Sequence, residues 1–409
     1  MPATQVPTER QVQVAVGISA AILFGVVLVN ALALSTLTRD FTNVYAAARI
    51  VSQGEGARLY DLQKQAQVEE GLFHWGGVFV FNHPPFEAWL FAPFALLPYT
   101  AAYVIWGAVN IVLWVLFVYI LRPYVLVPRN PLHYLLLCFV FFPVWVALMQ
   151  GQTSILLLVL LSLAFVCLKR RRDGWAGVFV GLGLFKFAVA APLALIFLLK
   201  GKWRLVAGFT WAAFMLGVVS LIAVGPAGMI GYVNLLVDTM RRPTYPPYAI
   251  EVSAMPNLRG FFHAILTSVL PGSTTNGVVV LASVFLIGYV AWRWHRQGPG
   301  EGQPFDLMFA AALVISQVTA FHLLIHDLSP TLIAVLLTLG SARYPERSPW
   351  RPARTAVIAA LYVIPACLLM FHAKPMYLLA PVLVLLAWAA MAGSASSFEA
   401  GEPGLVPDR

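Results

Sequence analysis

The fold is decided by residues 12–45, VQVAVGISAAILFGVVLVNALALSTLTRDFTNVY, in which a long apolar run ends in a polar segment. The run from Val12 to Leu37 exceeds the roughly 20 residues that a helix needs to cross a bilayer. It is too long for the apolar centre of a signal peptide and lacks a small-x-small cleavage site, so we interpret it as an uncleaved anchor. Asp40 follows where this helix leaves the bilayer, at the start of a polar stretch that extends to about residue 85.

The rest of the chain repeats this alternation of apolar runs and short polar loops. Of its 409 residues, 60% are hydrophobic and 11% are charged, whereas ordinary soluble domains carry about 25% charged residues. A membrane β-barrel would instead show short segments of alternating polarity. We therefore predict an all-α integral membrane protein, a polytopic bundle of about ten spans with a re-entrant hairpin and external interfacial helices.

The positive charges predict the orientation of the chain in the membrane. The net charge is +9, but the basic residues cluster in short loops between spans, which is typical of topology determinants rather than of a nucleic-acid surface. The strongest cytoplasmic signal is Lys169-Arg170-Arg171-Arg172. We predict a multi-pass protein of the cell membrane with both termini cytoplasmic, in contact with membrane lipids and with no nucleic-acid partner.

One apolar segment, from Trp175 to Leu199, has basic residues at both ends. We favour a re-entrant hairpin that turns near Phe185-Lys186-Phe187, and a single span with one basic loop outside is the alternative. Residues 1–391 are predicted to form one transmembrane domain whose external loops, 38–85 and 225–276, build the active site. Residues 392–409 are predicted to be a disordered cytoplasmic tail.

This topology places most of the unusual polar residues on the outer face. They are Asp40, Asp61, His83, Gln150, Gln152, Asn257, His326 and Asp327. Ordinary structural roles remain open for them, because an acid at a helix start can be an N-cap and Gln150-Gly151-Gln152 can be a tight turn. Lys186 is more informative: a lysine deep in an apolar segment costs about 2.5–3.5 kcal/mol and pairs with an acid or an anion unless it snorkels to an interface.

Several kinds of site are absent from the sequence. The three cysteines lie inside apolar runs, so neither a disulfide framework nor a zinc site is expected. There is no P-loop, no nucleophile elbow and no glycine-rich nucleotide fingerprint. We therefore expect no cofactor, and whether a divalent metal assists stays open.

The order of several short motifs resembles glycosyltransferase family 87, a group of GT-C membrane enzymes that includes polyprenol-phosphate-mannose-dependent mannosyltransferases. The motifs are Tyr45-Ala46-Ala47-Ala48, Gly56-Ala57-Arg58-Leu59-Tyr60-Asp61, Pro84-Pro85 ahead of Pro93 and Leu96-Leu97-Pro98, Trp106 with Asn110, Gly151-Gln152, Lys186 with Pro192, Asn257 with Gly260, and His326-Asp327-Leu328. The resemblance extends over about residues 38–340. It departs at His83, where the family more often has an aromatic residue before Pro-Pro.

The resemblance implies transfer of a hexose, such as mannose, from a polyprenyl-phosphate donor to a lipid or glycan acceptor hydroxyl on the non-cytoplasmic side, with inversion. Asp40 is the expected general base. The residues expected to bind the donor phosphate are Lys186, Arg241, Arg242 and His326, and those expected to bind substrate are Tyr45, Asp61, His83, Gln152, Asn257 and Asp327. The alternative hypothesis is a membrane transporter or lipid flippase, many of which show an internal symmetry that is not seen in this chain.

Overall fold

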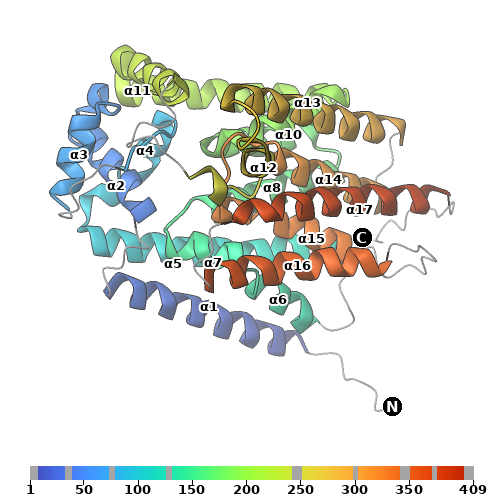
Figure 1. Ribbon diagram of the computed structural model, residues 1–409. Helices are drawn as coiled ribbons and strands as arrows, with labels where there is room; N and C mark the ends of the chain where they lie inside the picture. The colour runs from blue at the N-terminus through green and yellow to red at the C-terminus, as the bar shows by residue number, and fades with distance from the viewer. Residues whose placement is uncertain are drawn as a thin grey trace.

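The computed structural model describes residues 8–32, 39–72, 79–125, 131–241, 251–297, 303–340, 351–370 and 375–399, and all regular structure within these ranges is helical. Most of the helices lie lengthwise beside one another, and α2, α3 and α4 gather at one end of the bundle (Figure 1). The predicted all-helical class is confirmed.

The helices that build the bundle and its functional end follow one another along the chain. They are α1 (Glu9–Leu32), α2 (Arg39–Ser52), η2 (Gly56–Arg58), α3 (Leu62–Glu70), α4 (Pro85–Phe91), α5 (Tyr99–Leu121), α6 (Pro131–Phe139), α7 (Phe142–Met149), α8 (Ser154–Lys169), α9 (Asp173–Leu182), η5 (Gly183–Lys186), α10 (Phe187–Leu199), α11 (Trp203–Arg241), α12 (Leu258–Leu266), α13 (Gly272–Arg296), α14 (Gln303–Val318), η7 (Ile325–Leu328), α15 (Thr331–Gly340), α16 (Arg351–Met370) and α17 (Leu379–Glu399).

Several of these helices are suited to a bilayer. Within the described ranges, 6 helical segments are long and apolar enough to cross a membrane, and the pair α6–α7, bent by 50°, would make a seventh. Four shorter apolar segments, of 10–17 residues, belong to α8, α14, η7–α15 and α16. The chain is thus a helical membrane protein, and the number of about ten spans stays a prediction.

Ion pairs mark one end of the bundle. Lys169 Nζ lies 2.7 Å from Asp306 Oδ1, joining the end of α8 to the start of α14. Lys202 Nζ lies 2.9 Å from Asp173 Oδ2, joining the start of α11 to the start of α9. These are loops that the positive charges predict to be cytoplasmic, and they meet at the same end of the bundle.

The segment α9–η5–α10 turns back on itself. Its length and composition would suit a single crossing, but the ion pair between Lys202 and Asp173 holds its two ends together. The start of α11 then packs against α9 so closely that a Cβ atom on Gly177 would overlap the carbonyl oxygen of Leu205. This is the geometry of a helical hairpin, and Lys186 lies at its turn.

Two helices end at places that differ from the predicted spans. α11 continues beyond residue 224 to Arg241 through a kink at Gly225, whose φ of 66° only glycine adopts easily, and Pro226 restarts the helix. Part of the predicted loop 225–276 is therefore helical. The apolar run from Phe305 to Ile325 predicts one span, but α14 ends at Val318, because the backbone at residues 320–324 hydrogen-bonds to side chains instead of continuing the helix.

The C-terminal helix also runs further than the predicted last span. α17 continues to Glu399, past the predicted start of the tail at Ala392. Residues 400–409 lie outside the described part of the chain, as does Arg242.

The close packing of α9 on α11 is expected to make Gly177 intolerant of a side chain. The substitution Gly177→Ala should destabilise the protein by about 1–3 kcal/mol, because the new methyl group would overlap the backbone at Leu205. Gly217 in α11 is the matched control, since a Cβ atom there would meet nothing within 4 Å. Thermal unfolding in detergent measures both variants, and equal melting temperatures would contradict the packing.

Candidate active site

Three consecutive residues, Gln152-Thr153-Ser154, organise the end of the bundle opposite the ion pairs. The amide of the first donates a hydrogen bond to Asp40 Oδ2 at 3.0 Å. The hydroxyl of the second donates to Glu87 Oε1 at 3.3 Å, and the hydroxyl of the third donates to Asp327 Oδ1 at 3.2 Å. The start of α8 therefore gathers carboxylates from α2, α4 and η7, which we call the carboxylate cluster.

A rigid turn holds this tripeptide in place. Gly151 has a φ of 65°, which lets the chain reverse between α7 and α8. A Cβ atom at Gly151 would overlap Phe41, the residue that follows Asp40. The indole nitrogen of Trp106 donates a hydrogen bond to the carbonyl of Gly151 at 2.8 Å. The contact between Gly151 and Phe41 brings α2 against the turn and so aligns Asp40 with Gln152.

Lys186 enters the cluster from the turn of the α9–α10 hairpin. Its Nζ lies 2.8 Å from Asp327 Oδ1 and donates to Gln152 Oε1 at 3.0 Å. The Lys186 and Asp327 side chains are 12% and 5% exposed, so the charges form a buried pair. Gln152 thereby bridges Lys186 to Asp40, accepting from one with its oxygen and donating to the other with its nitrogen.

His326 lies between two of the carboxylates. Its Nδ1 is 2.7 Å from Gln150 Oε1 and 3.9 Å from Asp40 Oδ2, and its Nε2 is 3.4 Å from Asp327 Oδ1. Because an amide oxygen only accepts, Nδ1 carries a hydrogen and donates it to Gln150. The imidazole thus provides a hydrogen-bond donor next to the acidic groups.

The three carboxylates differ in how far their partners enclose them. Asp327 also accepts a hydrogen bond at 3.0 Å from the backbone N–H of Leu324, and Glu87 is fully buried. The Asp40 side chain is 31% exposed and has one hydrogen bond among the described residues, that from Gln152. Asp40 is therefore the most exposed of the three carboxylates.

A second histidine-containing pair adjoins the cluster. His83 Nδ1 lies 2.6 Å from Glu87 Oε2, and the Glu87 carboxylate also accepts the hydrogen bond from Thr153. Glu87 is four residues after His83, and Pro85 starts α4 between them, so the two side chains fall on the same face of one short turn. This arrangement joins the segment before α4 to the start of α8.

Four residues in and around the cluster were not singled out from the sequence: Glu87, Thr153, Ser154 and His322. Glu87 could have been predicted from the sequence, because an acidic residue in an otherwise apolar helix needs a hydrogen-bonding or charged partner. His322 precedes η7, and burial, opposed by the charge of Asp327, lowers its pKa to about 4. Its Nδ1 is buried with no hydrogen-bond partner in the described part of the chain.

Tyr45 and Asp61 each make hydrogen bonds to the backbone, and their expected role in substrate binding stays a prediction. The Tyr45 hydroxyl donates a hydrogen bond to the carbonyl of Leu97 at 2.6 Å and is buried among aromatic rings. Asp61 caps α3 by accepting hydrogen bonds from the backbone N–H groups of Gln63 and Lys64. No contact joins either of them to the carboxylate cluster within the described ranges.

Asn257 and Arg241 lie at the ends of helices. Asn257 is fully buried, caps α12 and donates a hydrogen bond to the carbonyl of Ala320 at 2.7 Å, so it positions the segment that leads to His322. Arg241 is exposed at the end of α11, and the described structure shows no bond from it to the cluster. Arg242 lies outside the described residues, so its predicted role in phosphate binding stays a prediction.

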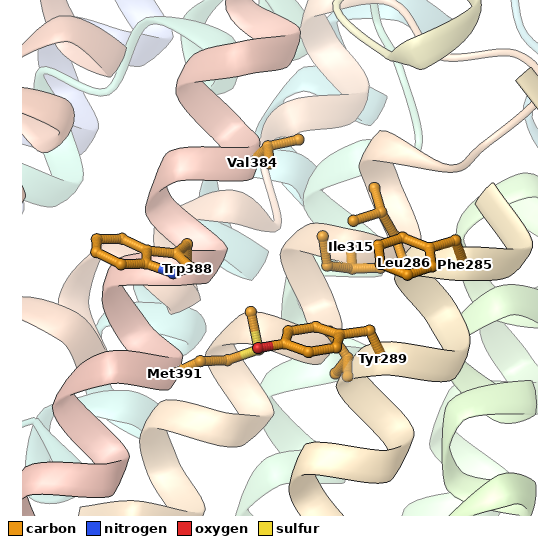
Figure 2. A pocket seen from close by; sticks show the side chains of 8 residues that line it. Phe285, Leu286, Tyr289, Ile315, Val384, Trp388 and Met391 are labelled. Carbon is orange, nitrogen blue, oxygen red and sulfur yellow. The ribbon is translucent and has the colours of Figure 1, made fainter. Parts of the chain in front are cut away.

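An apolar groove lies elsewhere in the bundle, between α13, α14 and α17. Figure 2 shows Phe285, Tyr289, Ile315 and Trp388 on its walls. Ile315 stands two residues before Gln317, whose amide donates a hydrogen bond to the carbonyl of Asp327 at 2.8 Å. Residues two apart face opposite sides of a helix, so α14 separates this groove from the carboxylate cluster. Among the described residues, no group of three or more His, Cys, Asp or Glu is placed to hold a metal ion.

The fold and this site define a helical membrane protein with a charged, partly open polar cluster at one end of its bundle. The profile of glycosyltransferase family 87 matches residues 81–325, more than half of the chain, and the chain belongs to this family. It is thus a membrane glycosyltransferase, and the resemblance seen in the motifs is confirmed. Neither a curated protein nor a solved structure was found to match. The matched range includes Lys186 and Gln152 but begins after Asp40 and ends just before His326.

The buried pair of Lys186 and Asp327 is expected to carry stability as well as function. The substitution Lys186→Met should destabilise the protein by about 3–5 kcal/mol, because it leaves Asp327 buried without its cation. The exposed pair of Arg58 and Asp61 is the control, and Arg58→Met should cost at most about 1 kcal/mol. Thermal unfolding compares the two variants, and a Lys186→Met protein as stable as the control would contradict the pairing.

Proposed function

We propose that the chain transfers a hexose, with mannose as the first candidate, from a polyprenyl-phosphate donor to the hydroxyl group of a lipid or glycan acceptor. The reaction takes place on the non-cytoplasmic side of the cell membrane and inverts the anomeric configuration. One observation carries the proposal: a partly open carboxylate, Asp40, is held one amide group away from a buried lysine, Lys186.

Asp40 is the group best suited to act as the general base. A base must come within about 2.6–3.2 Å of the hydroxyl whose proton it takes, so it needs an unoccupied face. Asp40 has that face, whereas Lys186 and the backbone occupy Asp327, and Glu87 is enclosed. The proton passes from the acceptor hydroxyl to Asp40 as the acceptor oxygen attacks the anomeric carbon. The bond from that carbon to the phosphate oxygen breaks, and a single displacement inverts the centre.

Lys186 is the group best suited to stabilise the departing phosphate. Its ammonium carries three N–H donors, of which Asp327 and Gln152 take two, leaving one for a phosphate oxygen. Positive charge placed where negative charge develops lowers the barrier to departure. The shared contact with Gln152 keeps base and cation at a fixed separation while the bond between sugar and phosphate breaks.

The position of the site along the bundle suits a lipid-linked donor. α8 starts at the cluster and ends at Lys169, a length of 16 residues or about 24 Å. This is close to the thickness of a hydrocarbon core, so the cluster lies near one membrane surface and Lys169 near the other. A donor with its phosphate at that surface and its polyprenyl chain in the bilayer could reach Asp40 without leaving the membrane.

Replacing the proposed base is expected to stop sugar transfer without unfolding the protein. The substitution Asp40→Asn should lower the turnover rate by about 10²–10⁴-fold, because the amide still accepts the hydrogen bond from Gln152 but takes no proton. Asp306→Asn, at the opposite end of the bundle, is the matched control and should stay near wild type. Membranes incubated with labelled polyprenyl-phosphate mannose and glucose report the transfer. An Asp40→Asn enzyme with normal turnover would remove the base assignment.

The two ends of the bundle are expected to be accessible from opposite sides of the membrane. Cysteine at Gln63, exposed on α3, should react with an impermeant maleimide added to intact cells. Cysteine at Arg172, exposed between α8 and α9, should react only after the cells are permeabilised. The exposed native Cys367 is first replaced by alanine. The opposite labelling pattern would place the proposed active site in the cytoplasm.

A further inference from the structure

The pair of His83 and Glu87 has features that packing alone does not require. Glu87 is fully buried, and the His83 side chain is 18% exposed. The distance of 2.6 Å between His83 Nδ1 and Glu87 Oε2 is short, as expected for a charge-assisted hydrogen bond. A buried carboxylate is strongly destabilising unless it is paired and hydrogen-bonded. In the described part of the chain, the Glu87 carboxylate has this imidazole and the Thr153 hydroxyl as its hydrogen-bond partners.

The imidazole ring is held in one orientation from several sides. It stacks on Phe81, with 5.5 Å between the ring centroids and 23° between the planes. The hydroxyl of Tyr60 donates a hydrogen bond at 2.7 Å to the backbone carbonyl of His83. With Nδ1 committed to Glu87, the other ring nitrogen, Nε2, is the free one, and no described residue hydrogen-bonds to it.

The charges around this pair call for a further cation if a phosphate is to bind. The cluster contains three carboxylates, Asp40, Glu87 and Asp327, and one lysine, Lys186. The charge of Lys186 is already matched by that of Asp327, and an anion brought near Asp40 would be repelled. Protonated His83 cancels the charge of Glu87 and offers an additional N–H donor. Its partner Glu87 accepts a hydrogen bond from Thr153, the neighbour of Gln152, so the pair belongs to the same site.

We infer that His83, held as an imidazolium by Glu87, binds an anionic oxygen of the donor phosphate through its Nε2–H group. Glu87 is then a positioning residue that acts through His83, in the way that a carboxylate orients and charges an imidazole elsewhere in enzymes. Thr153 ties this pair to the start of α8, and the neighbouring Gln152 binds Asp40 and Lys186. The inference rests on the proposed use of a phosphate-linked donor.

The experiment measures binding and turnover separately on the purified full chain. Equilibrium binding of polyprenyl phosphate, which carries no sugar, reports phosphate recognition without transfer. The substitutions His83→Phe and Glu87→Gln are compared with wild type, since phenylalanine keeps the stacking on Phe81 and glutamine keeps the shape of the carboxylate. We expect the Kd for polyprenyl phosphate and the donor KM each to rise about tenfold, as for the loss of one charge-assisted hydrogen bond, with kcat changed less than about threefold.

The double variant and two controls separate binding from general damage to the fold. If the pair acts as a unit, His83→Phe combined with Glu87→Gln should weaken binding no more than either change alone. The double variant also removes the buried unpaired carboxylate that His83→Phe leaves behind, so its melting temperature should recover. His263→Phe and Glu55→Gln, at ionisable side chains of the same types away from the cluster, should leave Kd and KM unchanged.

The outcomes separate this inference from the proposed function. A wild-type protein that transfers sugar from polyprenyl phosphate, with unchanged donor KM and Kd in both single variants, would overturn the role of His83 alone. A wild-type protein that transfers no sugar from any polyprenyl-phosphate hexose would overturn the proposed function. Folded variants whose kcat falls while Kd and KM stay constant would show that the pair does not bind the phosphate.

Discussion

Three hydrogen bonds from the start of α8 hold the functional end of this protein together. Gln152, Thr153 and Ser154 each bind a carboxylate from a different part of the chain, so α2, α4 and η7 converge on one turn. In a low-dielectric surrounding such bonds are strong, and an unpaired acid is costly. The same bonds that stabilise the acids also set their relative positions. Stability and site geometry therefore depend on the same few contacts.

The hairpin of α9 and α10 is the second constraint, because it supplies the cation that the acids need. Its two ends are joined by the ion pair between Lys202 and Asp173 at one end of the bundle, and its turn delivers Lys186 to the other. Packing so close that Gly177 touches the backbone of α11 keeps the hairpin from shifting. Lys186 therefore does not have to extend to the membrane surface, because Asp327 neutralises its charge and Gln152 accepts one of its hydrogen bonds.

Much of the fold followed from apolar length and from the placement of lysine and arginine. The all-helical class and the hairpin that turns near Lys186 were predicted in this way. The extension of α11 past Gly225 was not predicted. A glycine followed by a proline indicates a break in a helix, but the same pair occurs at a kink within a helix and at a helix end. The early end of α14 was not predicted, because an apolar run does not show where a distant side chain such as Asn257 hydrogen-bonds to the backbone and ends the helix.

The sequence by itself determined the helical membrane bundle, its family and the position of Asp40 just after the first apolar run. Hydrophobicity, charge bias and motif order are properties of the linear sequence, so they can be read without a structure. Only the tertiary structure decided which polar residues meet. Tyr45, Asp61 and Asn257 each hydrogen-bond to the backbone, Asp61 and Asn257 at the start of a helix and Tyr45 at the distant Leu97, and no sequence pattern showed these partners. Glu87 and Ser154 were recognised only in the structure. Their contacts join helices that are far apart in the sequence, and such contacts depend on packing that no local sequence pattern shows.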